Sequence, residues 1–145
     1  MLKINDIFVD TCVASRLSNP LDPKLKTFLT WLTKSGAPVI TNKIVGEYKM
    51  SLDPSNSNFF AVIDICTREG RVVKISNEQL KLFKFTKTQE RKLNSNSKDW
   101  PHIKAVLISP RKIAISFDKN FVCDLNEFPG HTATAGSDPG KLKYK

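Results

Sequence analysis

Four acidic residues stand where the sequence predicts that they act together. Asp10 directly follows a buried apolar strand, and Asp118 directly follows the last such strand. Glu47 lies on a helix that comes after another strand, and Asp99 opens the helix that precedes the last strand. In open α/β sheets the active crevice lies beyond the carboxyl ends of the strands. We therefore expect the four carboxylates to converge in one crevice.

The chemistry of such a crevice points to a metal ion. Like charges repel and each resists desolvation, so four close carboxylates are costly unless a cation offsets them. A set of oxygen donors without cysteine or histidine favours Mg²⁺ or Mn²⁺ over zinc. The natural chemistry of such an ion is activation of a water for in-line attack on a phosphodiester. We therefore interpret the four acids as catalytic and metal-binding residues.

Each acid also has a structural interpretation. Asp99 precedes a Trp-Pro pair, which is typical of a helix N-cap. Glu47 taken alone is most often a solvated helix residue, and Asp118 is compatible with an ordinary turn. Asp10 is the hardest to explain in this way, because it ends a strand that should be buried, where an unpaired carboxylate is rarely tolerated.

The elements that must position these acids alternate between strand and helix. Apolar runs without alternation predict strands over residues 4–10, 38–40, 71–75 and 112–117. Helical spacing and capping residues predict helices over 23–36, 41–52, 58–70 and 77–93 and from 99 onward. Because each crossover must cover the sheet, this alternation predicts a doubly wound α/β domain: a mainly parallel sheet with helices on both faces.

Size and composition fit one compact domain. The chain has 145 residues, of which 40% are hydrophobic, so its core needs no disulfide or structural metal. The three cysteines are widely spaced and odd in number, which fits neither a disulfide framework nor a zinc site. From Pro129 onward Gly, Pro, Thr, Ala and Lys dominate. We therefore expect a domain over residues 1–128 and a flexible basic C-terminal tail over 129–145.

Several other classes lack their sequence features. The apolar stretches are too short to cross a bilayer, and charges interrupt the N-terminal residues where a secretory signal is apolar, so we expect a cytoplasmic protein without membrane contact. The glycines form neither GxGxxG nor GxxxxGK, and no GxSxG is present. His102, on a predicted helix, and His131, in the predicted tail, are not expected to form the histidine pair of a metal-independent ribonuclease.

Four segments resemble the successive acidic motifs of PIN-domain nucleases, in that family's order and spacing: IFVDTCVASRL, TNKIVGEYKMSL, KDWPHIKAVLIS and IAISFDKNF. The resemblance covers residues 4–125 and places Asp10, Glu47, Asp99 and Asp118 at the family's acidic positions. It implies a PIN-like three-layer sandwich and a Mg²⁺- or Mn²⁺-dependent endoribonuclease, with the acids binding metal and orienting the attacking water. Many small members of the family are toxins of toxin–antitoxin pairs.

The resemblance also assigns supporting residues and shows two departures. Thr11 matches a hydroxyl residue of the family, whereas Cys12 replaces the usual Asn or Ser, so a polar contact is missing there. Asn120 stands where a second acid is common. Ser116 stands where a hydroxyl residue is frequent, and we expect it to hold Asp118 or a water in place. These departures keep an alternative open: a catalytically degenerate PIN-like module that binds RNA or a protein without cutting.

The charge balance favours a polyanionic partner. Lysine and arginine number 23 against 14 acids, a net charge of +9, and we expect single-stranded RNA to bind. The densest basic stretch aligns four cations along one face of the predicted helix over 77–93, which we call the basic stripe: Lys81, Lys84, Lys87 and Arg91. A solvated helix face is the alternative. A protein antitoxin and a second copy of the chain are the other partners that we consider.

Overall fold

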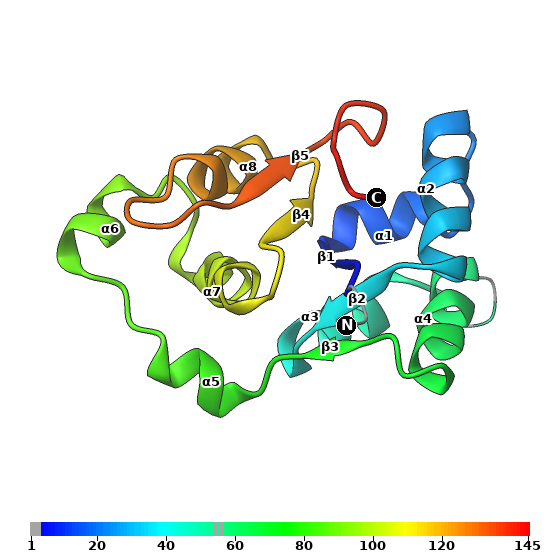
Figure 1. Cartoon of the computed structure of the whole chain (residues 1–145), viewed down its shortest axis with the longest axis horizontal. Helices are drawn as coiled ribbons and strands as arrows, with labels where there is room; N and C mark the ends of the chain where they lie inside the picture. The colour runs from blue at the N-terminus through cyan, green and yellow to red at the C-terminus, as the bar shows by residue number, and fades with distance from the viewer. Residues whose placement is uncertain (1–3, 54, 56) are drawn as a thin grey trace.

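The computed structural model describes residues 4–53, 55 and 57–145. The described residues form a five-stranded sheet whose order is β3-β2-β1-β4-β5 and whose neighbouring strands are all parallel (Figure 1). The strands are β1 (Asp6–Val9), β2 (Ala37–Ile40), β3 (Val73–Lys74), β4 (Ile113–Ile115) and β5 (Thr134–Gly136). This parallel order confirms the predicted doubly wound α/β fold.

The helices begin where capping residues allow them to begin. Asp22 accepts a hydrogen bond from the backbone N–H of Lys24 at the start of α2, and Thr41 accepts one from Ile44 at the start of α3. The helical elements are α1 (Thr11–Leu17), α2 (Pro23–Lys34), α3 (Asn42–Ser51), α4 (Asn58–Arg68), α5 (Asn77–Leu82), α6 (Lys87–Lys92), the 3₁₀ turn η1 (Ser97–Asp99), α7 (Trp100–Ile108) and α8 (Lys119–Asn126). None of these described helices has the length and apolar character needed to span a membrane.

The central strand explains the unbroken apolar runs of the sequence. β1 is buried along its whole length, because it has parallel neighbours on both edges and helices over the sheet. The chain runs outward from β1 through β2 to β3 and then returns to the other side of β1 to form β4 and β5. The strand order therefore reverses between β1 and β4. In such folds the ligand crevice opens at this switch point, beyond the carboxyl ends of the two strands.

The predicted helix over residues 77–93 is wrong in its middle. The structure has two short helices there, α5 and α6, joined by an extended segment that contains Phe83 and Phe85. Phe85 turns inward, with its ring centroid 5.1 Å from that of Phe128. Thr86 and Gln89 form a capping box that starts a new helix. Inward packing of the aromatic residues and this second capping box override the helical spacing of the cations.

The predicted flexible tail is also contradicted. Residues 134–136 form β5, which pairs with β4, and the chain that follows packs Leu142 and Tyr144 into the core. The Tyr144 ring lies 4.9 Å from Phe28 and 4.8 Å from Trp31 of α2, beside which the C-terminus ends (Figure 1). The segment has few large apolar residues, but sheet pairing and two anchoring side chains suffice to order it.

Candidate active site

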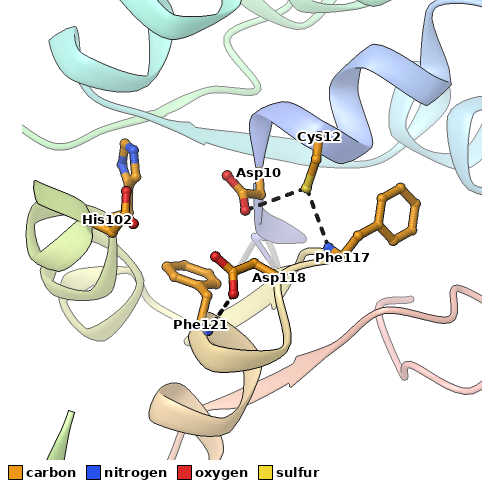
Figure 2. Close-up of a pocket in the computed structure, with 7 residues that line it drawn as sticks. Asp10, Cys12, His102, Phe117, Asp118 and Phe121 are labelled. Atoms are coloured by element: carbon orange, nitrogen blue, oxygen red, sulfur yellow. Dashed lines mark hydrogen bonds between the residues drawn. The ribbon is translucent and has the colours of Figure 1, made fainter. Parts of the chain in front are cut away.

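A cavity of about 370 Å³ opens at the switch point between β1 and β4 (Figure 2). Three of the four predicted acids line it: Asp10, Asp99 and Asp118. The other lining residues are Cys12, His102, Phe117 and Phe121. The parallel sheet thus brings together acids that are distant in the sequence, as the argument from strand ends predicts.

Asp10 and Asp118 face one another because they follow neighbouring strands. Val9 of β1 is in register with Ile115 of β4, and in Figure 2 the two carboxylates point toward the same space. Each also caps the helix that follows. Asp10 Oδ1 accepts a hydrogen bond of 2.8 Å from Thr11 N, and Asp118 Oδ1 accepts one of 2.9 Å from Asn120 N. The positive ends of α1 and α8 therefore help to hold two negative charges close together.

Ser116 joins the two acids. Its buried hydroxyl donates a hydrogen bond of 2.5 Å to Asp10 Oδ2 and accepts one of 3.0 Å from the backbone N–H of Asp118. From the sequence we expected Ser116 to hold Asp118 or a water. The structure shows that it contacts the backbone of Asp118 and the carboxylate of Asp10, so it fixes the position of one relative to the other.

Cys12 makes polar contacts at the position where we expected a polar contact to be missing. Its thiol lies 3.6 Å from Asp10 Oδ2 as a donor and 4.0 Å from Ser116 Oγ, and its sulfur accepts a hydrogen bond of 3.4 Å from Phe117 N. Partial burial raises the pKa of the Cys12 thiol, and the charge of Asp10 acts in the same direction. The group therefore remains a neutral thiol at neutral pH and can donate to Asp10.

The other two predicted supporting residues act through their backbones. The backbone N–H groups of Thr11 and Asn120 donate hydrogen bonds to the carboxylates of Asp10 and Asp118. The Thr11 hydroxyl is buried without a hydrogen-bond partner among the described residues, and the Asn120 side chain lies at the exposed surface.

Asp99 does not serve as a side-chain cap. It stands at the N-cap position of α7, but its carboxylate makes no capping hydrogen bond to that helix. The purely structural interpretation of Asp99 therefore lacks the interaction on which it depends. The residue is partly exposed and lines the cavity.

Glu47 reaches the cavity only through His102. It lies on α3, outside the cavity lining, and its Oε2 is 2.5 Å from Nε2 of His102 on α7. His102 is buried against Phe8, and its Nδ1 has no hydrogen-bond partner among the described residues. Sequence reasoning missed this histidine, although its position three residues after Asp99 puts both on one face of the chain at the start of α7.

Tyr48 fixes α3 against the end of β1. Its hydroxyl donates a hydrogen bond to the carbonyl oxygen of Val9, the residue before Asp10. Burial raises the pKa of Tyr48 well above its ordinary value, and the charges of Asp10 and Glu47 add to this. The phenol therefore stays protonated at neutral pH, and its hydrogen bond supports the end of β1, which Asp10 follows.

The donor chemistry suits a hydrated magnesium ion better than a closed protein cage. The part of the chain that the structure describes has no group of three or more His, Cys, Asp and Glu side chains that could hold a metal ion. Asp10 and Asp118 supply two neighbouring carboxylates (Figure 2). Mg²⁺ is commonly bound through one or two carboxylates, with waters and substrate phosphates completing its octahedron. Two carboxylates beside an open cavity fit that pattern.

The basic stripe does not form one helical face. Lys81 is on α5, Lys84 is in the extended segment, and Lys87 and Arg91 are on α6. All four residues are exposed. Figure 1 shows α5 and α6 at the side of the molecule away from α1, α2 and α4. The stripe is therefore a band of cations over two short helices.

Comparison of the chain with models of known protein families finds no match, and comparison with curated proteins finds no matching sequence.

Proposed function

We propose that this chain is a Mg²⁺- or Mn²⁺-dependent endoribonuclease of the PIN-domain type that hydrolyses single-stranded RNA in the cytoplasm. The observation that carries the proposal is the meeting of Asp10, Asp99 and Asp118 on one cavity at the switch point of a parallel sheet. The same positions carry the sequence motifs that resemble the family. The cavity and the resemblance to the family share these three residues, whereas Glu47 belongs to the resemblance alone. The cavity does not depend on the family.

The chain's own residues divide the work of such a site. Asp10 and Asp118 would hold the metal ion, with Ser116 and Cys12 keeping the Asp10 carboxylate in place. When bound, the ion would lower the pKa of a water and offset charge on the phosphodiester oxygens. Asp99, free of a capping bond, would orient the attacking water. Glu47, which we also predicted to be a ligand, lies outside the cavity lining and would act on the site through its contact with His102.

The charge distribution supports RNA as the substrate. A protein of net charge +9 attracts a polyanion, and a site that needs a metal ion to offset its acids suits a phosphodiester. The basic stripe is the part of this charge that we assign to the RNA backbone. Replacing Lys81 and Lys84 by alanine should reduce the slope of log RNA affinity against log salt concentration. The expected reduction is about 0.7 for each phosphate that the variant no longer binds. Alanine at Lys26 and Lys34, exposed on α2, is the matched control.

Cleavage of a labelled single-stranded RNA, with Mg²⁺, Mn²⁺ or chelator, tests the proposal. We expect metal-dependent cleavage by the wild type and none by Asp10→Asn or Asp118→Asn. Asp64→Asn is the control, because Asp64 is an exposed residue of α4 that, among the described residues, pairs only with Arg68. Cleavage retained by both site variants contradicts the assignment. Metal-independent RNA binding without cleavage by the wild type supports the non-cutting module instead.

A role as the toxin of a toxin–antitoxin pair is a narrower form of the proposal. Expression of the wild type should then arrest growth, whereas Asp118→Asn should not. Co-expression of a small reading frame adjacent to the gene should relieve the arrest. Growth unaffected by an actively cleaving wild type would separate the nuclease from the toxin role.

A further inference from the structure

We propose that a second cavity, which adjoins the acidic one at Phe117, binds the nucleotide next to the scissile phosphate, with the Phe117 ring as the surface on which its base stacks. This inference rests on the proposed function, because it concerns the path of the same RNA strand. It adds a binding site for one nucleotide unit, an aromatic surface for the base and a cation for the phosphate, outside the acidic motifs.

Phe117 is placed between the two cavities. It stands between Ser116 and Asp118, lines the acidic cavity and also lines the second one, whose volume is about 560 Å³. In Figure 2 its ring extends away from the carboxylates of Asp10 and Asp118. The hydrogen bond from its backbone N–H to Cys12 Sγ ties its backbone to α1. Phe117 therefore presents a ring from an anchored backbone.

Phe117 is one of five large apolar residues that are exposed in the part of the chain that the structure describes. With 38% of its surface exposed, it differs from Phe121, which lines the same acidic cavity and is 2% exposed. A large apolar side chain at the rim of a polar cavity costs solvation unless something covers it. Leu21, in the lining of the second cavity, is 85% exposed. The two side chains offer apolar surface to a planar base.

The same cavity holds an unpaired cation. It is built from the end of α1, the start of α2 and residues 137–139. Lys24 is paired there with Asp138 at 3.5 Å, and Asp22 caps α2. Arg16, in the last turn of α1, is exposed and has no carboxylate partner among the described residues. Arg16 is therefore the cation free to bind a phosphate, at a guanidinium suited to phosphate geometry.

These observations together fit nucleic acid better than other ligands. Single-strand binding sites combine aromatic faces, on which bases stack, with cations that contact the backbone. Suppose that one phosphate of the RNA lies at the acidic cavity and that the RNA passes over Phe117. Its next base then stacks on the Phe117 ring, and its next phosphate lies toward Arg16. Asn19 and Ser137 in the lining offer hydrogen bonds to a base or sugar. The continuity of the two cavities at Phe117 is what assigns the second one to the same strand.

Binding of a fluorescent single-stranded RNA in chelator, where cleavage is blocked, tests the stacking. Phe117→Ala should weaken binding by about 5- to 150-fold, the range expected for loss of one stacked base. Phe117→Trp should retain binding. Phe117→Leu should fall with the alanine variant, because it keeps apolar bulk without a π-face. Met50→Ala, which truncates a 90% exposed residue of α3, should bind like the wild type. Circular dichroism and melting temperature check that each variant folds.

Arg16 has its own test. Arg16→Ala should reduce the slope of log affinity against log salt by about 0.7, one phosphate contact on a single strand, whereas Arg16→Lys should keep the slope. Scanning one abasic nucleotide along the RNA should reveal a position whose loss weakens the wild type but not Phe117→Ala. That position should adjoin the site of metal-dependent cleavage.

The outcomes separate this inference from the proposed function. If the wild type cleaves RNA with metal but Phe117→Ala and Phe117→Leu bind RNA like the wild type, the stacking site is wrong and the nuclease assignment stands. An abasic scan that weakens both proteins equally also overturns it. If the wild type neither binds nor cleaves RNA, both proposals fail. A graded loss confined to Phe117→Ala and Phe117→Leu supports the site.

Discussion

The Ser116 hydroxyl donates a hydrogen bond of 2.5 Å to Asp10 Oδ2, although the two residues are 106 positions apart in the sequence. The hydroxyl oxygen of Ser116 also accepts a hydrogen bond from the backbone N–H of Asp118. A single buried atom therefore sets the relative positions of two acids that follow different strands. If the acids form a reactive site, removal of this atom should impair the site more than it impairs the fold.

Ser116→Ala should lower RNA cleavage by about 10- to 100-fold, as loss of a group that orients a metal ligand usually does. It should also lower the free energy of unfolding by about 1–3 kcal/mol, because the Asp118 N–H loses its acceptor. Ser109→Ala is the matched control. Ser109 is equally buried, but among the described residues its hydroxyl bonds only to the carbonyl oxygen of Val106, in the helix that Ser109 caps. Equal loss of cleavage in both variants would make Ser116 an ordinary core residue.

Asp118→Asn should stabilise the protein in chelator by up to about 1 kcal/mol, because it removes one of the facing carboxylates. Asparagine caps a helix about as well as aspartate, so α8 keeps its cap. Asp22→Asn makes the same exchange at the cap of α2, outside the cavity lined by Asp10, Asp99 and Asp118, and should cost about 0.3–1 kcal/mol through the helix dipole. Denaturant unfolding measures both changes. A destabilised Asp118→Asn would mark Asp118 as a structural residue.

Magnesium should reverse that order. At a free ion concentration of about one hundred times the dissociation constant, the wild type should gain about 2.7 kcal/mol and Asp118→Asn much less. Melting curves with chelator and with Mg²⁺ provide the measurement. The same gain in both proteins would remove Asp118 from the metal site.

Tyr48 should make the fold sensitive to alkaline pH. Its pKa is raised in the folded state, mainly by burial, so its contribution to stability is complete below the ordinary tyrosine pKa of about 10. Above that pH the unfolded chain loses the proton while the folded chain keeps it, so the free energy of unfolding falls until the pH passes the folded pKa. Tyr48→Phe should be less stable near neutral pH, since it lacks the bond to Val9, and should lose less stability between about pH 8 and about pH 11.

Tyr144→Phe is the control for the loss of the hydrogen bond between Tyr48 and Val9. Burial also raises the pKa of Tyr144, but its hydroxyl makes no hydrogen bond among the described residues. Near neutral pH this variant should therefore match the wild type in urea unfolding. A wild type and a Tyr48→Phe variant with parallel pH profiles would contradict the role of the buried phenol.

The C-terminal segment should be essential for stability, contrary to the prediction from composition. Tyr144→Ala removes a ring that packs against Phe28 and Trp31, and should cost about 3–5 kcal/mol. Lys145→Ala, at an exposed position, should cost nothing measurable. Thermal melting distinguishes the two. If Tyr144→Ala melts like the wild type, residues 137–145 are dispensable for stability.

Local patterns in the sequence determined most of the elements and the edge of the sheet where the acids meet. Unbroken apolar runs predicted β1 and β4, and the capping residues Asp22 and Thr41 predicted the starts of α2 and α3. Such signals lie within a few residues of the feature that they predict, so they can be interpreted without the fold. The rule for strand ends then placed Asp10 and Asp118 together.

Contacts between distant segments were decided only by the tertiary structure. The pairing of Glu47 with His102 joins α3 to α7, and β5 exists because residues 134–136 find the open edge of β4. Phe85 breaks the predicted long helix because Phe128 lies where its ring can be buried. In each case the stabilising partner is far away in the sequence, so hydrophobic periodicity and capping carry no sign of it. Burial and pairing across the fold outweigh local propensity, and these are properties of the assembled core.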